Sequence, residues 1–326
     1  MEIVTKKRMM LFSGTAHPEL AAEIADQLGV SLAPCKISRF AGGEIYVRPE
    51  ESVRGCDVFV IQTHHVDVNE AIMEQLIMLD AMKRASAKRI TAVIPYYGYS
   101  RQDKKALARE PISAKLVADL LTIAGADRLV SVDLHSGQIQ GFSDKPFDHL
   151  TALPLLVDYL QNEVGLSGDE VTVVAPDAGR IKTAQRLRDY LHADLAYIYK
   201  RRSRHEAHKI ESTEVVGEVE GQACVLVDDM IDTAGTMAQA AKVLAENGAG
   251  RIYAAATHAL FSGKAPQLLE EAPIESVVVT NTVPIPEDRM IGKVTVVSIA
   301  PIVASALRAV FEDASVSELF HGENQP

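Results

Sequence analysis

The sequence predicts an α/β protein of two similar halves, each a mostly parallel sheet flanked by helices. Short apolar runs without charged residues alternate with amphipathic stretches of helical length along the chain. Three of these runs end in aspartate, at Asp133, Asp177 and Asp228, and open α/β sheets bind ligands at the carboxyl ends of their strands. An internal repeat supports two halves, because Gly55, a strand, a helix and a second strand recur in the same order from Gly221.

The length of 326 residues suggests two domains or one large domain. The count of expected elements places a boundary near residue 150, although no linker is marked by composition. We therefore expect an N-terminal domain at residues 1–150 and a C-terminal domain at residues 151–311. The tail, residues 312–326, is expected to pack back on the N-terminal domain.

The composition is that of a globular protein, with 47% hydrophobic and 24% charged residues. A net charge of −11 argues against a nucleic-acid surface, so any phosphate chemistry must use local basic clusters. No apolar run reaches the roughly 18 residues of a membrane span, and the N-terminus lacks the apolar region of a signal peptide. Cys35, Cys56 and Cys224 have no metal-ligand spacing, so we expect reduced core thiols in a cytoplasmic protein without membrane contact.

In the first half, prolines and glycines mark the ends of the expected helices. Pro18 opens a helix that Gly29 ends, and Pro111 precedes another helix at residues 113–124. Residues 68–84 carry the apolar stripe of a core-facing helix. The expected strands are residues 9–13, 45–47, 57–62, 89–95 and 128–132.

The second half repeats the alternation of strands and helices. Apolar runs that are rich in β-branched residues are too short for helices and predict buried strands. The expected strands are residues 171–175, 193–199, 223–227, 251–257, 276–280 and 294–298. The expected helices are residues 154–162, a helix that follows residues 176–179 and ends near Leu191, a helix that follows the turn at 232–236 and ends near Asn247, and residues 302–311.

The most informative stretch begins where the strand at residues 223–227 ends. Asp228 and Asp229 follow it, and residues 232–236 (Asp232, Thr233, Ala234, Gly235 and Thr236) turn into a helix. The free N–H groups at a helix start favour an anion, and Gly235 allows close approach of the backbone. The carboxylates repel an anion and match hydroxyl groups, so the stretch predicts a ribose 5-phosphate site. The plain alternative is a strand end followed by an ordinary acidic turn.

Two further strand ends in the first half carry candidate ligands. The strand at residues 89–95 leads into aromatic and cationic residues at 96–105, which suit a nucleotide: rings or a guanidinium for the base, cations for phosphates. The strand at residues 128–132 leads into Asp133 and His135, which share a face of an extended segment and suit magnesium. A simple Asp–His hydrogen bond is the alternative. His64 and His65, in an earlier loop, are expected to be solvated rather than metal ligands.

A polar run at residues 200–209, rich in lysine, arginine and histidine, follows the strand at 193–199. Such a run is usually a solvated surface segment. In an acidic protein, a basic loop at the edge of a sheet also suits a lid that closes on polyphosphate.

These stretches resemble the ribose-phosphate diphosphokinase (PRPP synthetase) family, in its phosphate-activated class. The residues at 232–236 are similar to the PRPP-binding loop of phosphoribosyltransferase-like proteins. The most specific motifs are residues 94–99 with 101–105, and residues 133–135 with 138–142. The similarity runs from residue 12 to residue 320, almost the whole chain. It implies a phosphoribosyltransferase-like fold for each half.

The resemblance also implies roles for individual residues. For ATP it implies a site made of Phe40, Gly42, Gly43, Glu44, Arg101 and Gln102, with Phe40 supplied by a neighbouring subunit. For magnesium it implies His135 and Asp177, with Asp133 beside them. Lys200 and Arg202 belong to a catalytic loop, and Arg202 also to the ribose 5-phosphate site of Asp228, Asp229, Asp232, Thr233, Ala234, Gly235 and Thr236.

The implied reaction transfers the β,γ-diphosphoryl group of ATP to the anomeric hydroxyl of ribose 5-phosphate, giving PRPP and AMP. Gly42 stands where the family often has an acidic residue, and Ala178, Gly179 and Arg180 replace its usual double glycine. The segment 203–212 also matches poorly. Two other functions stay open: a transferase that consumes PRPP, which shares only the PRPP loop, and a catalytically silent regulatory homologue.

Assembly and regulation follow from the same resemblance. It implies a homo-oligomer of dimers, expected as a hexamer, with phosphate as activator and ADP as inhibitor at a subunit interface. The matching positions are Ser52, Arg54, Arg109, Ser315, Ser317 and Phe320. Arginine forks and serine hydroxyls suit an oxyanion. Surface arginines beside a disordered tail are the plain alternative.

Overall fold

The computed structural model describes residues 7–65, 67–202 and 210–320, with the backbone alone at residues 200–202, 210–213 and 320. The chain divides into two compact units. Unit 1 comprises Met1–Thr151, Thr282–Pro284 and Ser298–Pro326, and unit 2 comprises Ala152–Asn281 and Ile285–Val297. The expected second domain, residues 151–311, is therefore wrong at its C-terminal end, because residues from Ser298 belong to unit 1.

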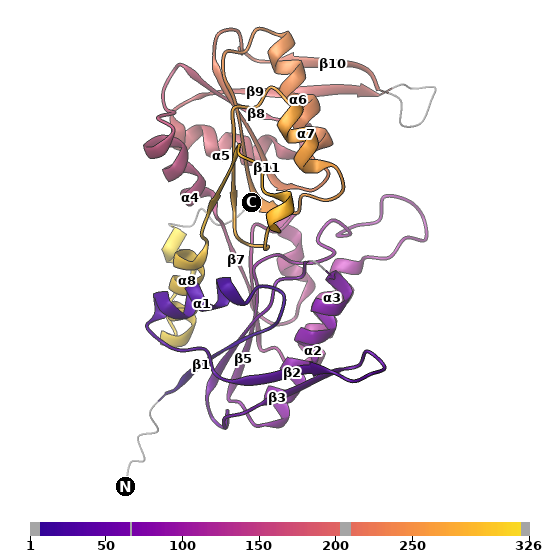
Figure 1. The fold of residues 1–326 in the computed structure, drawn as a ribbon, viewed down its shortest axis with the longest axis vertical. Coiled ribbons are helices and arrows are strands. Elements are labelled where there is room, and N and C mark those ends of the chain that lie inside the picture. The colour runs from indigo at the N-terminus through magenta and orange to yellow at the C-terminus, as the bar shows by residue number, and fades with distance from the viewer. Residues whose placement is uncertain (1–6, 66, 203–209, 321–326) are drawn as a thin grey trace. The chain divides into compact units, whose positions relative to one another are not determined.

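Unit 1 is built on a sheet of five parallel strands in the order β1-β4-β5-β6-β7. The strands are β1 (Met9–Ser13), β4 (Asp57–Ile61), β5 (Arg89–Ile94), β6 (Arg128–Val132) and β7 (Phe147–Leu150). A separate antiparallel hairpin joins β2 (Cys35–Arg39) to β3 (Ile45–Pro49). Figure 1 shows α1 (Pro18–Leu28) and α8 (Ala300–Glu312) on one side of the sheet, and α2 (Val68–Arg84) and α3 (Ser113–Ala124) on the other.

The placement of α8 has a local cause. The helix packs against α1, where the Ser298 hydroxyl donates to Glu23 and the Arg308 guanidinium donates to the carbonyl of Gln27. Just beyond α8, Asp313 forms ion pairs with Lys7 and Arg89. These contacts join the C-terminal segment to the N-terminal half, although 224 to 306 residues separate the partners along the chain.

Unit 2 is built on a sheet of seven strands in the order β10-β9-β8-β11-β12-β13-β14. All neighbours are parallel except the β9–β10 pair. The strands are β8 (Val171–Ala175), β9 (Asp194–Arg202), β10 (Ile210–Val216), β11 (Ala223–Ile231), β12 (Ile252–Ala259), β13 (Ser276–Thr280) and β14 (Val294–Val297).

Helices cover both faces of this second sheet (Figure 1). One apolar core lies under α6 (Gly235–Glu246) and α7 (Ala265–Glu271), and it includes Leu226. The other lies under α4 (Leu153–Asp158) and α5 (Ile181–Leu191), and it includes Val225 and Val227. Because successive strand residues point to opposite faces, β11 supplies both cores and its apolar run must lack charge.

The two sheets repeat one topology, as the sequence repeat predicts. In unit 1, β1 pairs with β4 and α2 connects β4 to β5; in unit 2, β8 pairs with β11 and α6 connects β11 to β12. Among the described residues, no helix has the length and apolarity that a membrane crossing requires. The equivalent strands allow a direct comparison of the polar groups at their carboxyl ends.

Candidate active site

The carboxyl end of β11 carries two adjacent aspartates. The expected strand end at Val227 is wrong, because pairing with β12 continues through Met230 and carries β11 to Ile231. Asp228 and Asp229 therefore lie within the strand and are held by its ladder. Their side chains are only 14% and 7% exposed.

Arg180 joins the two aspartates. It ends a short 3₁₀ turn, Ala178–Arg180, that follows β8, the strand adjacent to β11. Its Nε lies 2.6 Å from Oδ1 of Asp228, and its Nη2 lies 2.6 Å from Oδ1 of Asp229. Sequence reasoning noted Arg180 only as a departure from a motif, since the contact depends on the pairing of two strands 50 residues apart.

The acidic pair is electrostatically unusual. Burial raises the pKa of Asp228 to about 8, and the charge and hydrogen bond of Asp229 add to the rise, while Arg180 opposes it. Two carboxylates in a poorly hydrated place resist double ionisation, and a nearby guanidinium favours it. Strong pKa shifts of this kind are typical of functional sites.

The turn after β11 is open toward solvent. Thr233, Gly235 and Thr236 are exposed, and α6 begins at Gly235 without a side-chain cap or an acidic residue in its first turn. The left-handed backbone conformation falls on Ala234, with φ of 61°, rather than on the glycine. A Cβ at Gly235 would meet only Thr233 Oγ1 within 4 Å, at 3.9 Å. The uncapped N–H groups and the open space together suit an anion.

The other acidic strand end of unit 2 is more constrained. Asp177 follows β8, and its Oδ1 accepts a hydrogen bond of 2.8 Å from the N–H of Gly179. This side chain caps the 3₁₀ turn from which Arg180 extends.

The basic segment differs from its expected form. Instead of ending at residue 199, β9 continues to Arg202 and pairs with β10, with Lys200 opposite Thr213. Lys200 and Arg202 are thus strand residues rather than loop residues in this structure. Their side chains, and all of residues 203–209, lie outside the described part of the chain.

In unit 1, the loop after β5 divides into a buried and an exposed part. Tyr96 and Tyr97 are only 5% and 1% exposed, so these rings belong to the core and are not placed to stack on a base. Arg101 and Gln102 are exposed, and Gln102 Oε1 accepts from the Ser113 hydroxyl at 2.6 Å. In this loop Arg101 is therefore exposed and Tyr99 is half-buried, while the other two rings are not available for base contact.

Asp103 links this loop to the candidate metal loop. Its buried Oδ2 accepts hydrogen bonds of 2.7 Å from the Ser136 hydroxyl and from the Gln138 amide. The sequence analysis gave Asp103 no role. The contact nonetheless ties Arg101 and Gln102 to the segment that contains His135.

The hairpin of β2 and β3 carries the remaining ATP-site candidates. Phe40 is 58% exposed, and its N–H donates to the Glu44 carbonyl across the bend. Gly42 and Gly43 have open space where a Cβ would lie, and Gly43 has a φ of 91°. The tip projects from the unit (Figure 1), so an aromatic ring is held out in solvent.

The metal candidates occupy two units. Asp133, with a φ of 36°, and His135 are half-buried in unit 1, and Asp177 is half-buried in unit 2. Within the described ranges, no three acidic, histidine or cysteine side chains gather as a metal-binding group. One carboxylate and one imidazole still fit magnesium, which keeps most of its octahedron for water and phosphate oxygens.

His64 corrects another expectation. It is fully buried, its Nε2 lies 2.8 Å from Gln75 Oε1, and its Nδ1 accepts from the N–H of Gly98. Burial lowers the pKa of His64 to about 4. It is a neutral core histidine rather than a solvated one.

The candidate regulatory residues with described side chains are exposed. They are Ser52, Arg54, Arg109, Ser315 and Ser317, while the Phe320 side chain lies outside the described part. Asp57 and Asp313 both pair with Arg89, which holds the segment after α8 near the segment that precedes β4. Ser315 and Arg54 lie two and three residues from these anchors.

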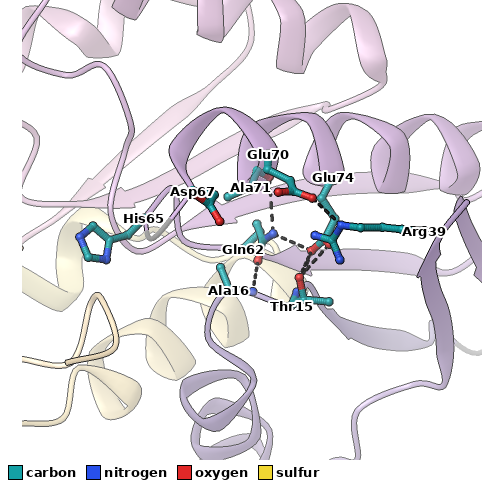
Figure 2. Close-up of a pocket in the computed structure, with 9 residues that line it drawn as sticks. All are labelled: Thr15, Ala16, Arg39, Gln62, His65, Asp67, Glu70, Ala71 and Glu74. Atoms are coloured by element: carbon teal, nitrogen blue, oxygen red, sulfur yellow. Dashed lines mark hydrogen bonds and ion pairs between the residues drawn. The ribbon is translucent and has the colours of Figure 1, made fainter. Parts of the chain in front are cut away.

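Unit 1 also has a polar pocket at the carboxyl ends of β1 and β4, with a volume of about 140 Å³. In Figure 2, Gln62 and Thr15 point toward Glu74. Glu74 accepts hydrogen bonds of 2.7 Å from the Gln62 amide and from the Thr15 N–H. Arg39, from β2, pairs with Glu70 at the pocket edge.

Comparison with known proteins places the chain in a family. A model of the N-terminal domain of ribose phosphate pyrophosphokinase matches residues 9–125, and a model of the phosphoribosyl synthetase-associated domain matches residues 203–321. The chain belongs to the ribose-phosphate pyrophosphokinase family. The resemblance found in the sequence is thus confirmed.

Individual members of the ribose-phosphate pyrophosphokinase family match over nearly their full length. The protein of that name from Streptomyces avermitilis is 54% identical over 315 residues, 97% of each chain. The one from Mycobacterium leprae is 52% identical over 319 residues, 98% of this chain and 97% of the relative. The crystal structure of phosphoribosylpyrophosphate synthetase from Mycobacterium smegmatis superposes with a TM-score of 0.89 at 52% identity, covering 94% of this chain and all of that one. The predicted fold class, two mostly parallel sheets flanked by helices, is confirmed.

Proposed function

We propose that the chain is a transferase that makes PRPP and AMP from ATP and ribose 5-phosphate, the reaction of its family. The observation that carries this proposal is the carboxyl end of β11. There the first turn of α6 has no side-chain cap and no acidic residue. It follows Asp228 and Asp229, which both form ion pairs with Arg180. A phosphate and vicinal hydroxyls are the groups that such neighbours bind.

Ribose 5-phosphate is proposed to lie across the end of β11. Its phosphate accepts hydrogen bonds from the turn that holds Thr233, Gly235 and Thr236, with Asp232 and Ala234 shaping that turn. Its ring hydroxyls donate to Asp228 and Asp229. This orientation leaves the anomeric hydroxyl free to attack the β-phosphorus of ATP in line.

ATP is proposed to use the exposed polar groups of unit 1. Arg101 packs on the adenine ring together with Phe40, which comes from a neighbouring chain. Gly42, Gly43, Glu44 and Gln102 also belong to this site. Phe40 is 58% exposed on a projecting hairpin, so its ring is accessible to a neighbouring chain.

Asp133, His135 and Asp177 are proposed to hold magnesium. When bound with ATP, the ion would neutralise phosphate charge. Lys200 and Arg202 are proposed to stabilise the charge that grows on the transferred diphosphoryl group, and Arg202 also contacts ribose 5-phosphate. No covalent intermediate is required, because positioning and charge stabilisation account for most of such catalysis.

The chain is proposed to form dimers that assemble into a hexamer. Its proposed location is the cytoplasm. Phosphate and ADP are proposed as effectors at the site of Ser52, Arg54, Arg109, Ser315, Ser317 and Phe320. Lys7 and Arg89 hold the segment beyond α8 through ion pairs with Asp313. These ion pairs support the proposal that Arg54 and Ser315 lie close together.

The deciding experiment measures AMP release from ATP with and without ribose 5-phosphate. We expect AMP release that requires both substrates and magnesium. A transferase that consumes PRPP would release no AMP, and a silent homologue would bind substrates without turnover. Either result would contradict the proposed reaction.

A further inference from the structure

Arg180 forms ion pairs with both Asp228 and Asp229, and the proposed reaction does not by itself require these contacts. One guanidinium spans two carboxylates and lies 2.6 Å from an oxygen of each. All three side chains are largely shielded, with exposures of 15% for Arg180, 14% for Asp228 and 7% for Asp229. The N–H of Asp229 also donates to Oδ1 of Asp228 at 2.8 Å.

The contact of Arg180 with Asp228 and Asp229, here called the clamp, reduces the electrostatic repulsion between the two carboxylates. Adjacent buried carboxylates repel each other when ionised, and loss of the cation would leave two like charges with poor hydration. A proton shared between them removes one acceptor site that a sugar hydroxyl could use. A planar guanidinium relieves the repulsion and directs both groups, which a flexible point charge does less well.

Unit 1 provides an internal reference for this clamp. By sheet register, Met9 pairs with Asp57 as Val171 pairs with Ala223. Counting along each chain segment places Pro18 in unit 1 where Arg180 stands in unit 2, and Gln62 where Asp228 stands. The arginine is thus present at the strand end that has the acidic pair and absent from its neutral counterpart.

We propose that Arg180 is the positioning residue of the sugar site: it holds Asp228 and Asp229 so that both accept hydrogen bonds from vicinal ribose hydroxyls. This inference rests on the proposed binding of ribose 5-phosphate at the end of β11. It assigns to Arg180 the discrimination between ribose 5-phosphate and its 2-deoxy analogue, which lacks one of the two hydroxyls.

The test compares dissociation constants of ribose 5-phosphate, 2-deoxyribose 5-phosphate and ATP by calorimetry on the full chain. In Arg180→Gln, ribose 5-phosphate should bind about 10- to 100-fold more weakly, the range for losing hydrogen bonds to charged groups. The deoxy analogue should lose less affinity, so the ratio between the two sugars should fall. ATP binding should change less than about threefold.

Two further variants separate positioning from general damage. Arg180→Lys keeps one charge but cannot span both carboxylates, so its sugar ratio should lie between wild type and Arg180→Gln. Arg180→Gln combined with Asp229→Asn removes the repulsion and should bind ribose 5-phosphate more tightly than Arg180→Gln alone. If Arg180→Gln does not fold, as judged by circular dichroism, Arg180→Lys alone carries the test.

The outcomes distinguish this inference from the proposed function. Equal loss of affinity for both sugars, or an unchanged ratio in both variants, would overturn the role of Arg180 while the reaction stands. A wild-type chain that does not bind ribose 5-phosphate would overturn both.

Discussion

The carboxyl ends of β4 and β11 are equivalent positions in two similar sheets, yet the polar groups at β4 are paired with one another and the turn after β11 is exposed to solvent. At β11, Arg180 clamps Asp228 and Asp229, and α6 starts without an acidic residue in its first turn. At β4, Gln62 donates to Glu74 and accepts from the N–H of Ala16, so the polar groups that line the small pocket are hydrogen-bonded to one another (Figure 2).

The helix starts differ in the same direction. In α2 the first turn contains Glu70, and buried Glu74 follows one turn later, so negative charge lies where α6 offers free N–H groups. An anion is favoured at the start of α6 and repelled at the start of α2. A strand–turn–helix unit therefore becomes a binding site only when its polar groups are left for a ligand rather than satisfied internally.

Among these predictions, substitution of Lys200, the proposed catalytic cation of unit 2, should have the largest effect. Lys200→Ala should lower turnover by roughly 10²–10³-fold, because the cation acts mainly on the transition state, with modest change in substrate dissociation constants. Steady-state kinetics and calorimetry measure both quantities. Lys242→Ala, at an exposed position of α6, is the matched control and should keep wild-type turnover. Near-normal turnover in Lys200→Ala would contradict the proposed catalytic role of Lys200.

The acidic pair gives the next largest effect. Above pH 8, where Asp228 is ionised, Asp228→Asn should weaken ribose 5-phosphate by about 10- to 100-fold and leave ATP affinity nearly intact, because a charged acceptor is lost. Gln62→Met, at the equivalent position of unit 1, should instead lower the free energy of unfolding by about 1–3 kcal/mol, since Glu74 and the N–H of Ala16 lose a partner. Calorimetry and urea unfolding separate the two. Opposite selectivity would mean that the strand ends have exchanged roles.

Two glycines sharpen the contrast between filled and open space. A Cβ at Gly14 would lie 2.3 Å from Gln62 Oε1, whereas a Cβ at Gly235 would meet only Thr233 Oγ1, at 3.9 Å. Gly14→Ala should therefore destabilise the fold by about 1–3 kcal/mol. Gly235→Ala should leave the melting temperature unchanged or slightly raised and weaken ribose 5-phosphate several-fold, since its methyl group occupies the phosphate's approach. Equal melting temperatures for the two variants would contradict the packing difference.

The smallest effect concerns pH, which should act on the two strand ends in opposite directions. The pKa of His64 is lowered to about 4, so its stabilisation is present above pH 6.5 and is lost as pH falls toward 4. The pKa of Asp228 is raised to about 8, so its stabilisation is present at low pH and is lost as pH rises through 8.

Thermal unfolding from pH 5 to pH 8.5 tests these signs. The loss of stability of His64→Asn relative to wild type should be smallest at low pH. The stability of Asp228→Asn relative to wild type should be greatest at high pH. The shifts should amount to a few degrees, at about 2–4 °C per kcal/mol for domains of this size. The same pH trend in both variants would show that the two ends do not titrate independently.

Much of this architecture follows from local patterns in the sequence. The strands Met9–Ser13, Arg128–Val132 and Val171–Ala175 have the predicted bounds, since each is an apolar run between polar ends. The turn at residues 232–236 and its helix were also predictable, because glycine, threonine and aspartate at a strand end have few other uses. These features depend on residues that are neighbours along the chain.

Tertiary structure decided what depends on distant partners. Strands β2, β7 and β10 and helix α7 were not predicted, because their short, mixed sequences become regular only through pairing and packing. Helix α8 was expected at residues 302–311, but its packing against α1, which lies near the other end of the chain, was not. Arg180 is the example at the candidate site, because its contacts with Asp228 and Asp229 require β8 to lie beside β11. The sequence shows these three residues, but only the pairing of the two strands brings them into contact.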